Sequence, residues 1–432
     1  MRTFVSTRGT GSVSFAEALF GGLAPDGGLY VPEEVPRLPA PPAFLAGEGF
    51  PALARWAAPR LFEGAAAPDV LAEVVGRALD FPVSLVELEP GLRVLELFHG
   101  PTLAFKDVGA RFMACMMSAL DREAGHRRTV LVATSGDTGS AVAHAFRGLE
   151  RTRVVVLFPR DGVSQRQRRQ MTTLGGNVTA VAVEGAFDDC QRLVKGAFSD
   201  AALAAEAGLT SANSINVGRL LPQTLYYVHA QASIGWDRPA AFVVPSGNLG
   251  NLTGGLLGLR AGMPVAGFVA ASNVNRVFPD YLESGVVETR PSVRTVSNAM
   301  DVGAPSNLER VRWLYGGDVE ALRRDVRGAW ADDLETRAAI REVHRRYGYL
   351  LDPHGAVGWA AHRKVPADAG IPVVLLATAH PAKFPEVVEE AVGAAVDVPE
   401  RLAERLDAPE AMEHIAPDPA ALRNLVLEHV RA

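Results

Sequence analysis

Lys106 is the residue whose type and place best suit covalent chemistry. It lies in the turn FHGPTLAFKD, residues 98–107, which follows an apolar run at 94–98, and a helical pattern begins directly after it. The positive end of a helix disfavours an ammonium group and therefore favours a neutral, nucleophilic amine. Asp107 is placed to cap the first turn of this helix. The pattern predicts an imine-forming lysine at a strand-to-helix turn.

Lysine is rare in this chain, which makes Lys106 conspicuous. Of 43 basic side chains only four are lysines, at positions 106, 195, 364 and 383, and the others are arginines. Arginine supplies charge, but its guanidinium stays protonated and cannot form an imine. Lys383 is the rival imine former, and it ranks second because it lies one helical turn's length past its predicted strand. Composition alone does not choose between them, so the neighbouring motifs must.

The bulk composition excludes several classes of function. A chain of 432 residues can form two or three domains with real cores, and its 48% apolar and 21% charged residues are typical of a soluble globular protein. A net charge of −6 gives no reason to expect nucleic acid or a membrane surface as partner. Two cysteines and the absence of an apolar leader predict a cytoplasmic protein, and the histidines show no metal-ligand spacing. We expect a small-molecule substrate, no metal, and a monomer or homodimer.

Strand and helix patterns alternate from residue 94 onward. The strand runs are continuously apolar, which is typical of parallel sheets covered on both faces. We therefore predict an α/β fold with two doubly wound parallel-sheet domains and a mainly helical N-terminal region. The predicted boundaries are residues 1–92, 93–235 and 236–432. The predicted strands lie at residues 94–98, 129–133, 153–158, 177–183, 241–244, 265–270 and 371–377.

Ligands of such folds bind beyond the carboxyl ends of the strands, so the turns there are the candidate sites. The turn TSGDTGS at 134–140 combines hydroxyls, glycines and a helix start, and either binds a carboxylate or phosphate or is a capped tight turn. In PSGNLGN at 245–251, successive N–H groups can converge on a phosphate ester. The GxGxxG and GxxxxGK[ST] fingerprints are missing from this chain, which argues against a nucleotide-binding protein.

Three further features complete the set of candidate positions. Thr378, at the end of a predicted strand, can present its hydroxyl to a ligand ring or be a plain strand-end threonine. Arg219, in SANSINVGR at 211–219, can hold a second phosphate bidentately or be a surface arginine. The segments at 297–303 and 352–358 are unusual in composition but indicate no chemistry, and the remaining histidines are interpreted as structural or surface residues.

The chain resembles the threonine synthases, pyridoxal-phosphate enzymes of the tryptophan-synthase-β (type II) fold, in an ordered set of motifs. The likeness also includes STRG and GLAPDGGLYVPE near the N-terminus and covers nearly the whole chain. Two departures are Leu249, where the family usually has phenylalanine, and Arg276, where an acidic residue is common. The motifs are FHGPTLAFKD, ATSGDTGSA, QMTTLG, SANSINVGR, PSGNLGN, SNAMDVGAPSN, DPHGAVG and ATAHPAKF.

The resemblance implies roles for the candidate residues. Lys106 would hold pyridoxal 5'-phosphate as an internal aldimine, and Thr378 would face the pyridine nitrogen. The residues implied at the cofactor phosphate are Gly247, Asn248, Leu249, Gly250 and Asn251. The substrate O-phospho-L-homoserine needs a second anion site. The residues implied for it are Ser135, Asp137 and Thr138 near its amino-acid end, and Asn213, Ser214 and Arg219 at its phosphate.

The implied reaction converts O-phospho-L-homoserine and water to L-threonine and phosphate. Two alternatives remain open at this point. One is a serine/threonine dehydratase-like pyridoxal-phosphate lyase, which needs no second phosphate site. The other is a catalytically silent threonine-synthase-like protein that only binds a phosphorylated ligand, and the intact Lys106 argues against it.

Overall fold

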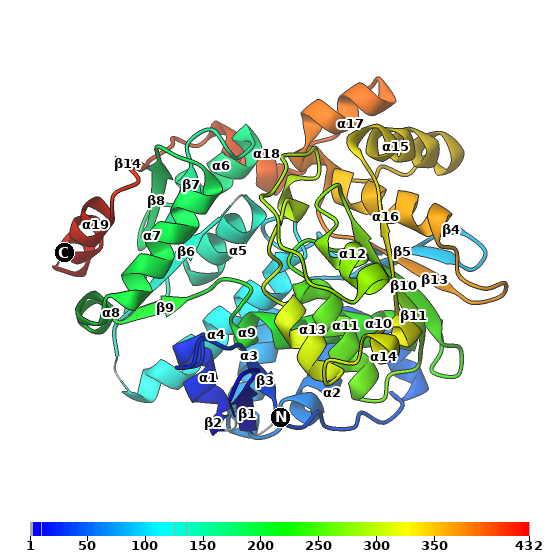
Figure 1. Cartoon of the computed structure of the whole chain (residues 1–432), viewed down its shortest axis with the longest axis horizontal. Helices are drawn as coiled ribbons and strands as arrows, with labels where there is room; N and C mark the ends of the chain where they lie inside the picture. The colour runs from blue at the N-terminus through cyan, green and yellow to red at the C-terminus, as the bar shows by residue number, and fades with distance from the viewer. Residues whose placement is uncertain (1–2, 10, 125, 135, 432) are drawn as a thin grey trace.

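Two sheets, each surrounded by helices, make up most of the molecule (Figure 1). The architecture comes from a computed structural model, which describes residues 3–9, 11–124, 126–134 and 136–431. The N-terminal region lies below both sheets in the view of Figure 1. In the described residues, no helix combines the length and the apolar character needed to cross a lipid bilayer.

The smaller sheet has the order β14-β8-β7-β6-β9 in the described chain, and all of its neighbouring strands are parallel. Its strands are β6 (Arg128–Ala133), β7 (Thr152–Pro159), β8 (Val178–Val183), β9 (Leu209–Ser211) and β14 (Glu413–Ile415). The helices around it are α5 (Asp137–Phe146), α6 (Gln165–Thr172), α7 (Phe187–Ser199), α8 (Ala201–Ala207) and α19 (Pro419–Arg431). Most residues of β6, β7 and β8 are buried, as expected for strands covered on both faces.

The larger sheet has the order β12-β11-β10-β13-β5-β4 across the described residues, and only the β4–β5 hairpin in it is antiparallel. Its strands are β4 (Ser84–Glu89), β5 (Leu92–Glu96), β10 (Ala240–Pro245), β11 (Val265–Ser272), β12 (Val326–Trp330) and β13 (Val373–Ala377). The helices that follow or cover its strands are α10 (Thr224–Ile234), α11 (Gly250–Arg260), α12 (Val277–Ser284), α13 (Leu308–Leu314), α14 (Val319–Asp325), α15 (Asp333–Tyr347), α16 (Pro353–Lys364) and α17 (Pro385–Val392). Short 3-10 turns are η3 (Asn298–Met300) and η4 (Pro381–Lys383), and α18 (Glu400–Asp407) packs on α6.

Each parallel strand expected from the sequence is present with bounds that differ by a few residues. Strand pairing also joins segments that the predicted boundaries separate. Strand β5 falls in the unit predicted at 93–235, yet Leu375 of β13 pairs with its Val94 in the larger sheet. Strand β14 falls in the unit predicted at 236–432, yet it forms an edge of the smaller sheet. The chain therefore passes from one sheet to the other directly after β5, where Lys106 lies.

The N-terminal region contains a small antiparallel sheet as well as the expected helices. Its strands have only three or four residues each, too few to show an alternating pattern in the sequence. The elements are β1 (Thr3–Ser6), β2 (Ser12–Ser14), α1 (Phe15–Gly21), β3 (Tyr30–Pro32), η1 (Ala43–Ala46), α2 (Gly49–Leu61) and α3 (Pro68–Ala78). Helices α2 and α3 pack against each other, and α3 packs on the long helix α4 (Lys106–Ala124).

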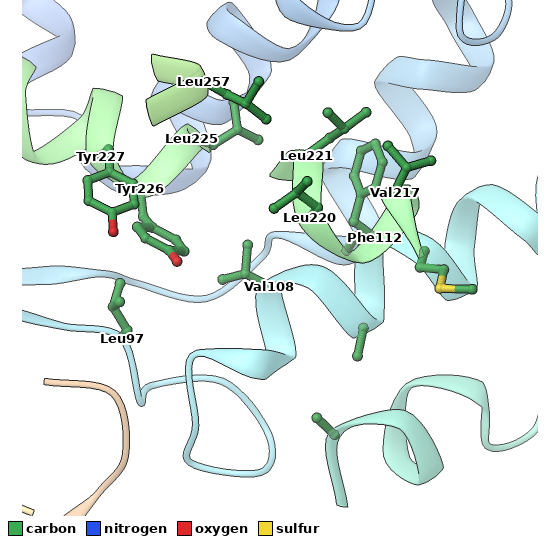
Figure 2. Close-up of a cluster of buried hydrophobic side chains, with 14 of the residues drawn as sticks. Leu97, Val108, Phe112, Val217, Leu220, Leu221, Leu225, Tyr226, Tyr227 and Leu257 are labelled. Carbon is green, nitrogen blue, oxygen red and sulfur yellow. The ribbon is translucent and has the colours of Figure 1, made fainter. Parts of the chain in front are cut away.

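Apolar packing fixes the position of helix α4 (Figure 2). Its residues Val108 and Phe112 are fully buried in a cluster with side chains from α9 (Val217–Leu220), η2 (Leu221–Gln223) and α10. The ring centroid of Phe112 lies 5.2 Å from that of Phe62. Because Lys106 is the first residue of the same helix, this cluster also determines where the Lys106 side chain begins.

We expect Phe112→Ala to lower the free energy of unfolding by about 3–5 kcal/mol, because it removes a fully buried aromatic ring and leaves a cavity. Phe44→Ala is the matched control: its side chain is 70% exposed, so the same substitution should change stability by less than about 0.5 kcal/mol. Urea titration of both variants measures the difference. Equal losses for the two variants would contradict the packing described here.

Candidate active site

The predicted site residues come together around one cavity of about 940 Å³. Strand ends from both sheets and the N-terminal loop after α1 contribute to its wall. Ser135 lies outside the described residues. The other predicted residues all line the cavity: Lys106, Asp137, Thr138, Asn213, Ser214, Arg219, Gly247, Asn248, Leu249, Gly250, Asn251 and Thr378.

Lys106 reaches the cavity from the first turn of α4, and its side chain is 14% exposed. Burial lowers the pKa of its amine to about 8, helped by the positive charges of Lys383 and Arg219 and opposed by the carboxylate of Asp137. The Lys106 Nζ lies 3.9 Å from Asp137 Oδ2. With such a pKa, roughly one amine in ten is neutral at pH 7, far more than for an ordinary lysine.

The turn before Lys106 is held against the end of strand β13. The Phe105 N–H donates to the Thr378 carbonyl at 2.9 Å, and the His380 N–H donates to the Leu103 carbonyl at 3.0 Å. Leu103 has a φ of 59°, a left-handed conformation that is costly for a side chain branched at Cγ. These bonds fix the spacing between Lys106 and Thr378. Thr378 lies at the cavity wall and is 5% exposed.

Asp107 does not cap helix α4, contrary to the expectation from the sequence. Helix α4 already begins at Lys106, and the buried Asp107 carboxylate accepts bonds from the Thr102 N–H at 2.8 Å and the Thr102 hydroxyl at 2.7 Å. It therefore closes the turn that leads into the helix. Gly100 is required in this turn because a Cβ there would lie 2.5 Å from the Asp107 Oδ2 atom.

The loop at 245–251 joins strand β10 to the N-terminus of helix α11. Leu249 precedes the helix with a left-handed φ of 60°, and no side chain of the described residues caps it. Asn251 Oδ1 accepts bonds from the hydroxyls of Tyr226 and Tyr227 at 2.6 and 2.7 Å, while its buried Nδ2 has no partner in the described part of the chain. The loop therefore offers helix N–H groups and one amide donor to an anion.

Asn248 connects this loop to the segment predicted to bind a second phosphate. Its Nδ2 donates to the Ser214 Oγ at 2.5 Å, and its Oδ1 accepts from the Ser306 N–H at 2.5 Å. The buried Asn213 Oδ1 has no partner among the described residues. The two candidate anion loops thus share one wall of the cavity.

Two buried guanidinium groups give this wall a positive charge. Arg219 is 3% exposed, and its Nη1 donates to the Ala212 carbonyl at 2.7 Å, whereas its Nε has no partner in the described chain. Arg310, behind the wall, is fully buried, and it donates hydrogen bonds to neutral oxygens, among them the Tyr30 carbonyl at 2.9 Å and Asn307 Oδ1 at 2.7 Å. Burial lowers the pKa of Arg219 to about 10 and that of Arg310 to about 9. Buried cations without a bonded carboxylate favour a multiply charged anionic ligand.

Comparison with known proteins identifies the family. Residues 88–378 match the family described as pyridoxal-phosphate dependent enzyme, residues 3–79 match threonine synthase N terminus, and residues 355–426 match threonine synthase, C-terminal. The threonine synthase of Escherichia coli K12 is 43% identical over 425 residues, which cover 96% of this chain and 97% of that protein. The chain belongs to the threonine synthase family.

Solved structures of threonine synthases share the whole fold. The threonine synthase from Brucella melitensis, solved with PLP bound, superposes with a TM-score of 0.94 at 37% identity and covers 100% of both chains. The Escherichia coli threonine synthase gives a TM-score of 0.91 at 41% identity and covers 99% of this chain and 100% of its own. These matches confirm the α/β, type II fold expected from the sequence.

Pyridoxal phosphate is the cofactor of this family, and the cavity residues fit it. Lys106 supplies an amine with a lowered pKa. Helix α11 presents uncapped N–H groups beside the unpartnered Nδ2 of Asn251. Thr378 lies across the turn from Lys106. An imine-forming amine, an anion loop and a hydroxyl are the donor set that a phosphorylated pyridine aldehyde needs.

Two segments to which the sequence gave no role also line the cavity of this threonine synthase family member. Asp301 accepts the Thr295 N–H at 2.9 Å, and burial raises its pKa to about 6 although the bonds from Thr295 act in the opposite direction. His354, whose role the sequence left open, faces the cavity, with Nδ1 2.6 Å from Asp352 Oδ2 and Nε2 accepting the Ala299 N–H at 3.2 Å. Their place in the ordered family motifs was the signal for them.

Lys383 and Arg276, the rival lysine and the arginine that departs from the family pattern, both lie away from the cavity lining. Lys383 is fully buried, and its Nζ is bonded to Asp137 Oδ1 at 2.7 Å and to the Thr102 carbonyl at 2.8 Å. Arg276 does not line the cavity; it pairs with Asp280 at 3.2 Å and lies over the Trp330 ring. Lys383 therefore has its amine engaged, whereas Lys106 has its amine in the cavity.

We expect Lys106→Met to stabilise the cofactor-free chain by about 1–3 kcal/mol at pH 7, because a buried ammonium with a lowered pKa costs stability. The cost is fully present below the folded pKa of about 8, and it is lost as the pH rises through the ordinary lysine pKa of 10.5. The difference between variant and wild type should therefore shrink between pH 8 and pH 10.5. Urea titrations at pH 7 and pH 10 measure it.

Lys195→Met is the matched control for this measurement. Lys195 lines the same cavity but is exposed, so we expect its replacement to leave stability within about 0.5 kcal/mol at both pH values. A pH-independent effect of Lys106→Met would contradict the lowered pKa.

Proposed function

We propose that the chain is a threonine synthase that converts O-phospho-L-homoserine and water to L-threonine and phosphate. The observation that carries this proposal is the pairing of one reactive amine, Lys106, with two separate anion sites in a single cavity. The loop before helix α11 suits the phosphate of the cofactor, and the buried Arg219 suits a second phosphate. A dehydratase-like lyase would have no use for the second site.

The proposed cofactor residues follow three strands of the larger sheet, β5, β10 and β13. Lys106 Nζ holds the aldehyde carbon of pyridoxal phosphate, and the segment Gly247–Asn251 holds its phosphate through backbone N–H groups. The Thr378 hydroxyl faces the ring nitrogen and tunes it more weakly than a carboxylate does. When bound, the cofactor supplies an electron sink for negative charge at the substrate α-carbon.

The proposed substrate residues divide between its two ends. Arg219, Asn213 and Ser214 bind the phosphate, supported by the unpartnered donor Arg219 Nε. Ser135 and Thr138 are assigned to the amino-acid carboxylate, as the family motif implies. Asp137 belongs near the substrate's amino group, because a buried carboxylate repels another carboxylate and attracts an ammonium group.

Lys106 is the proposed proton carrier. When it is not bonded to the cofactor, its Nζ would be free to take the proton from the substrate α-carbon and to carry protons to and from the β-carbon. A pKa of about 8 places this group close to the working pH, which is where a general base is most effective. Arg219 then stabilises the phosphate that leaves the γ-carbon, and water adds at the β-carbon.

A small-molecule substrate suffices for this activity. We infer a cytoplasmic location from the cysteine content of the sequence. A monomer or homodimer stays a prediction, to be read from sedimentation of the purified chain.

Phosphate release from O-phospho-L-homoserine tests the proposal. The purified protein with pyridoxal phosphate should release phosphate and form threonine in equal amounts. Lys106→Ala should bind the substrate in calorimetry yet turn it over at least 1,000-fold more slowly, roughly the contribution of a general base together with the covalent anchor. A 2-oxo acid and ammonia as products would support the dehydratase-like alternative. Binding by the wild type without turnover would support the silent binding protein.

Arg219→Ala tests the second phosphate site. We expect kcat/KM for O-phospho-L-homoserine to fall by about 100-fold or more, because a buried charge-assisted contact is worth roughly 3 kcal/mol. Cofactor occupancy, read from the visible absorbance, should stay within twofold of wild type. Arg160→Ala is the control, since Arg160 is an exposed arginine paired with Glu184 at 3.7 Å. Unchanged turnover in Arg219→Ala would refute this assignment.

A further inference from the structure

Asp137 lies between two lysines, Lys106 at the cavity wall and the buried Lys383. Its Oδ1 lies 2.7 Å from Lys383 Nζ, and its Oδ2 lies 3.9 Å from Lys106 Nζ. Gln167 Nε2 also donates to Oδ1, at 3.0 Å. The closer of the two lysines is therefore Lys383, although Lys106 is the residue with the proposed chemistry.

Burial and hydrogen bonds fix the position of the Lys383 ammonium group. Its side chain is completely buried, and its second bond is to the carbonyl of Thr102 at 2.8 Å. Lys383 follows strand β13 of the larger sheet, whereas Asp137 begins helix α5 on the smaller sheet. The ion pair thus joins the two sheets directly beside Lys106.

The charge balance at Lys106 depends on which lysine satisfies Asp137. The charged groups that face Lys106 are Asp137 of α5, Lys383 of η4, Arg219 of α9 and Asp352 before α16. His354 of α16 faces Asp137. Burial raises the pKa of Asp137, but Lys383 and Lys106 outweigh it and hold that pKa well below its ordinary value, so the group is an anion. Without Lys383, the nearest cation for this anion would be a protonated Lys106.

We propose that Lys383 is a positioning residue for the reactive amine: by binding Asp137, it keeps that carboxylate from capturing Lys106 as an ammonium ion and leaves the Lys106 amine free as a nucleophile. This inference rests on the proposed function of Lys106. It also gives Lys383 a role that is not imine formation, in agreement with its complete burial and its two hydrogen bonds.

Competitive acetylation tests the proposal in the full-length chain freed of cofactor. Limiting acetic anhydride modifies only neutral amines, and peptide mass spectrometry follows each of the four lysines separately. In Lys383→Met, which removes the charge but keeps an unbranched side chain one atom shorter, the labelling midpoint of Lys106 should rise by about one pH unit or more. Attachment of pyridoxal phosphate at pH 7 should slow by about tenfold and recover at higher pH, a pattern that loss of structure does not produce.

Two further variants make the result decisive. In Asp137→Asn the Lys106 midpoint should fall, and Lys383→Met added to that background should raise it by clearly less than in the wild type, because only the direct repulsion between the two amines remains once residue 137 has no charge. Lys383→Gln keeps an N–H donor without the charge and replaces Lys383→Met if the methionine variant fails to fold; its midpoint should rise as well. Lys364→Met, at an exposed lysine paired with Glu335, is the control and should leave Lys106 unchanged.

The proposal is overturned if neither variant of Lys383 moves the Lys106 midpoint, or if the same rise occurs in the Asp137→Asn background. Borohydride trapping of the cofactor on Lys383 would also overturn it. Failure of the proposed function has a different signature, because it appears as absence of phosphate release by the wild type.

Discussion

The interaction on which the rest of the site depends is the burial of one carboxylate, Asp137, between two lysines. A buried anion is tolerable only with a cation in contact, and Lys383 meets this need at 2.7 Å while Lys106 stands at 3.9 Å. The same contact connects helix α5 of the smaller sheet to the end of β13 in the larger one. One ion pair therefore joins the two halves of the cavity and leaves a second amine with a lowered pKa.

The larger structure supplies the rigidity that this arrangement needs. Helix α4 is fixed by the apolar cluster of Figure 2, and the turn before it is tied to the end of β13 by backbone bonds at Leu103 and Phe105. Left-handed residues at Leu103 and Leu249 flank the two functional turns. Backbone strain of this kind persists only where surrounding contacts determine the conformation, so it is stored where the chemistry requires a fixed geometry.

The second feature of the site is a group of buried arginines that have no carboxylate partner. Arg219 and Arg310 are buried with bonds to neutral oxygens, and the N-terminus of α11 adds its helix dipole. A site that collects this much buried cationic character is less stable empty than filled, and phosphate esters are the ligands that balance it. The family assignment agrees with such a ligand.

The sequence by itself determined the positions of seven parallel strands along the chain, the α/β class and the motifs of the site, because continuous apolar runs and glycine-rich turns are local signals. It also singled out Lys106, since lysine is rare here and this one follows a strand. Tertiary structure alone decided that Asp107 closes a turn instead of capping α4, that His354 faces the cavity, and that Lys383 binds Asp137 from 246 residues away along the chain. Tertiary structure also decided that β5 pairs in the larger sheet and β14 in the smaller one, because no local pattern shows which sheet a strand joins. Pairing of distant charges and strands depends on where the folded chain places them, and that information is not contained in any single stretch of sequence.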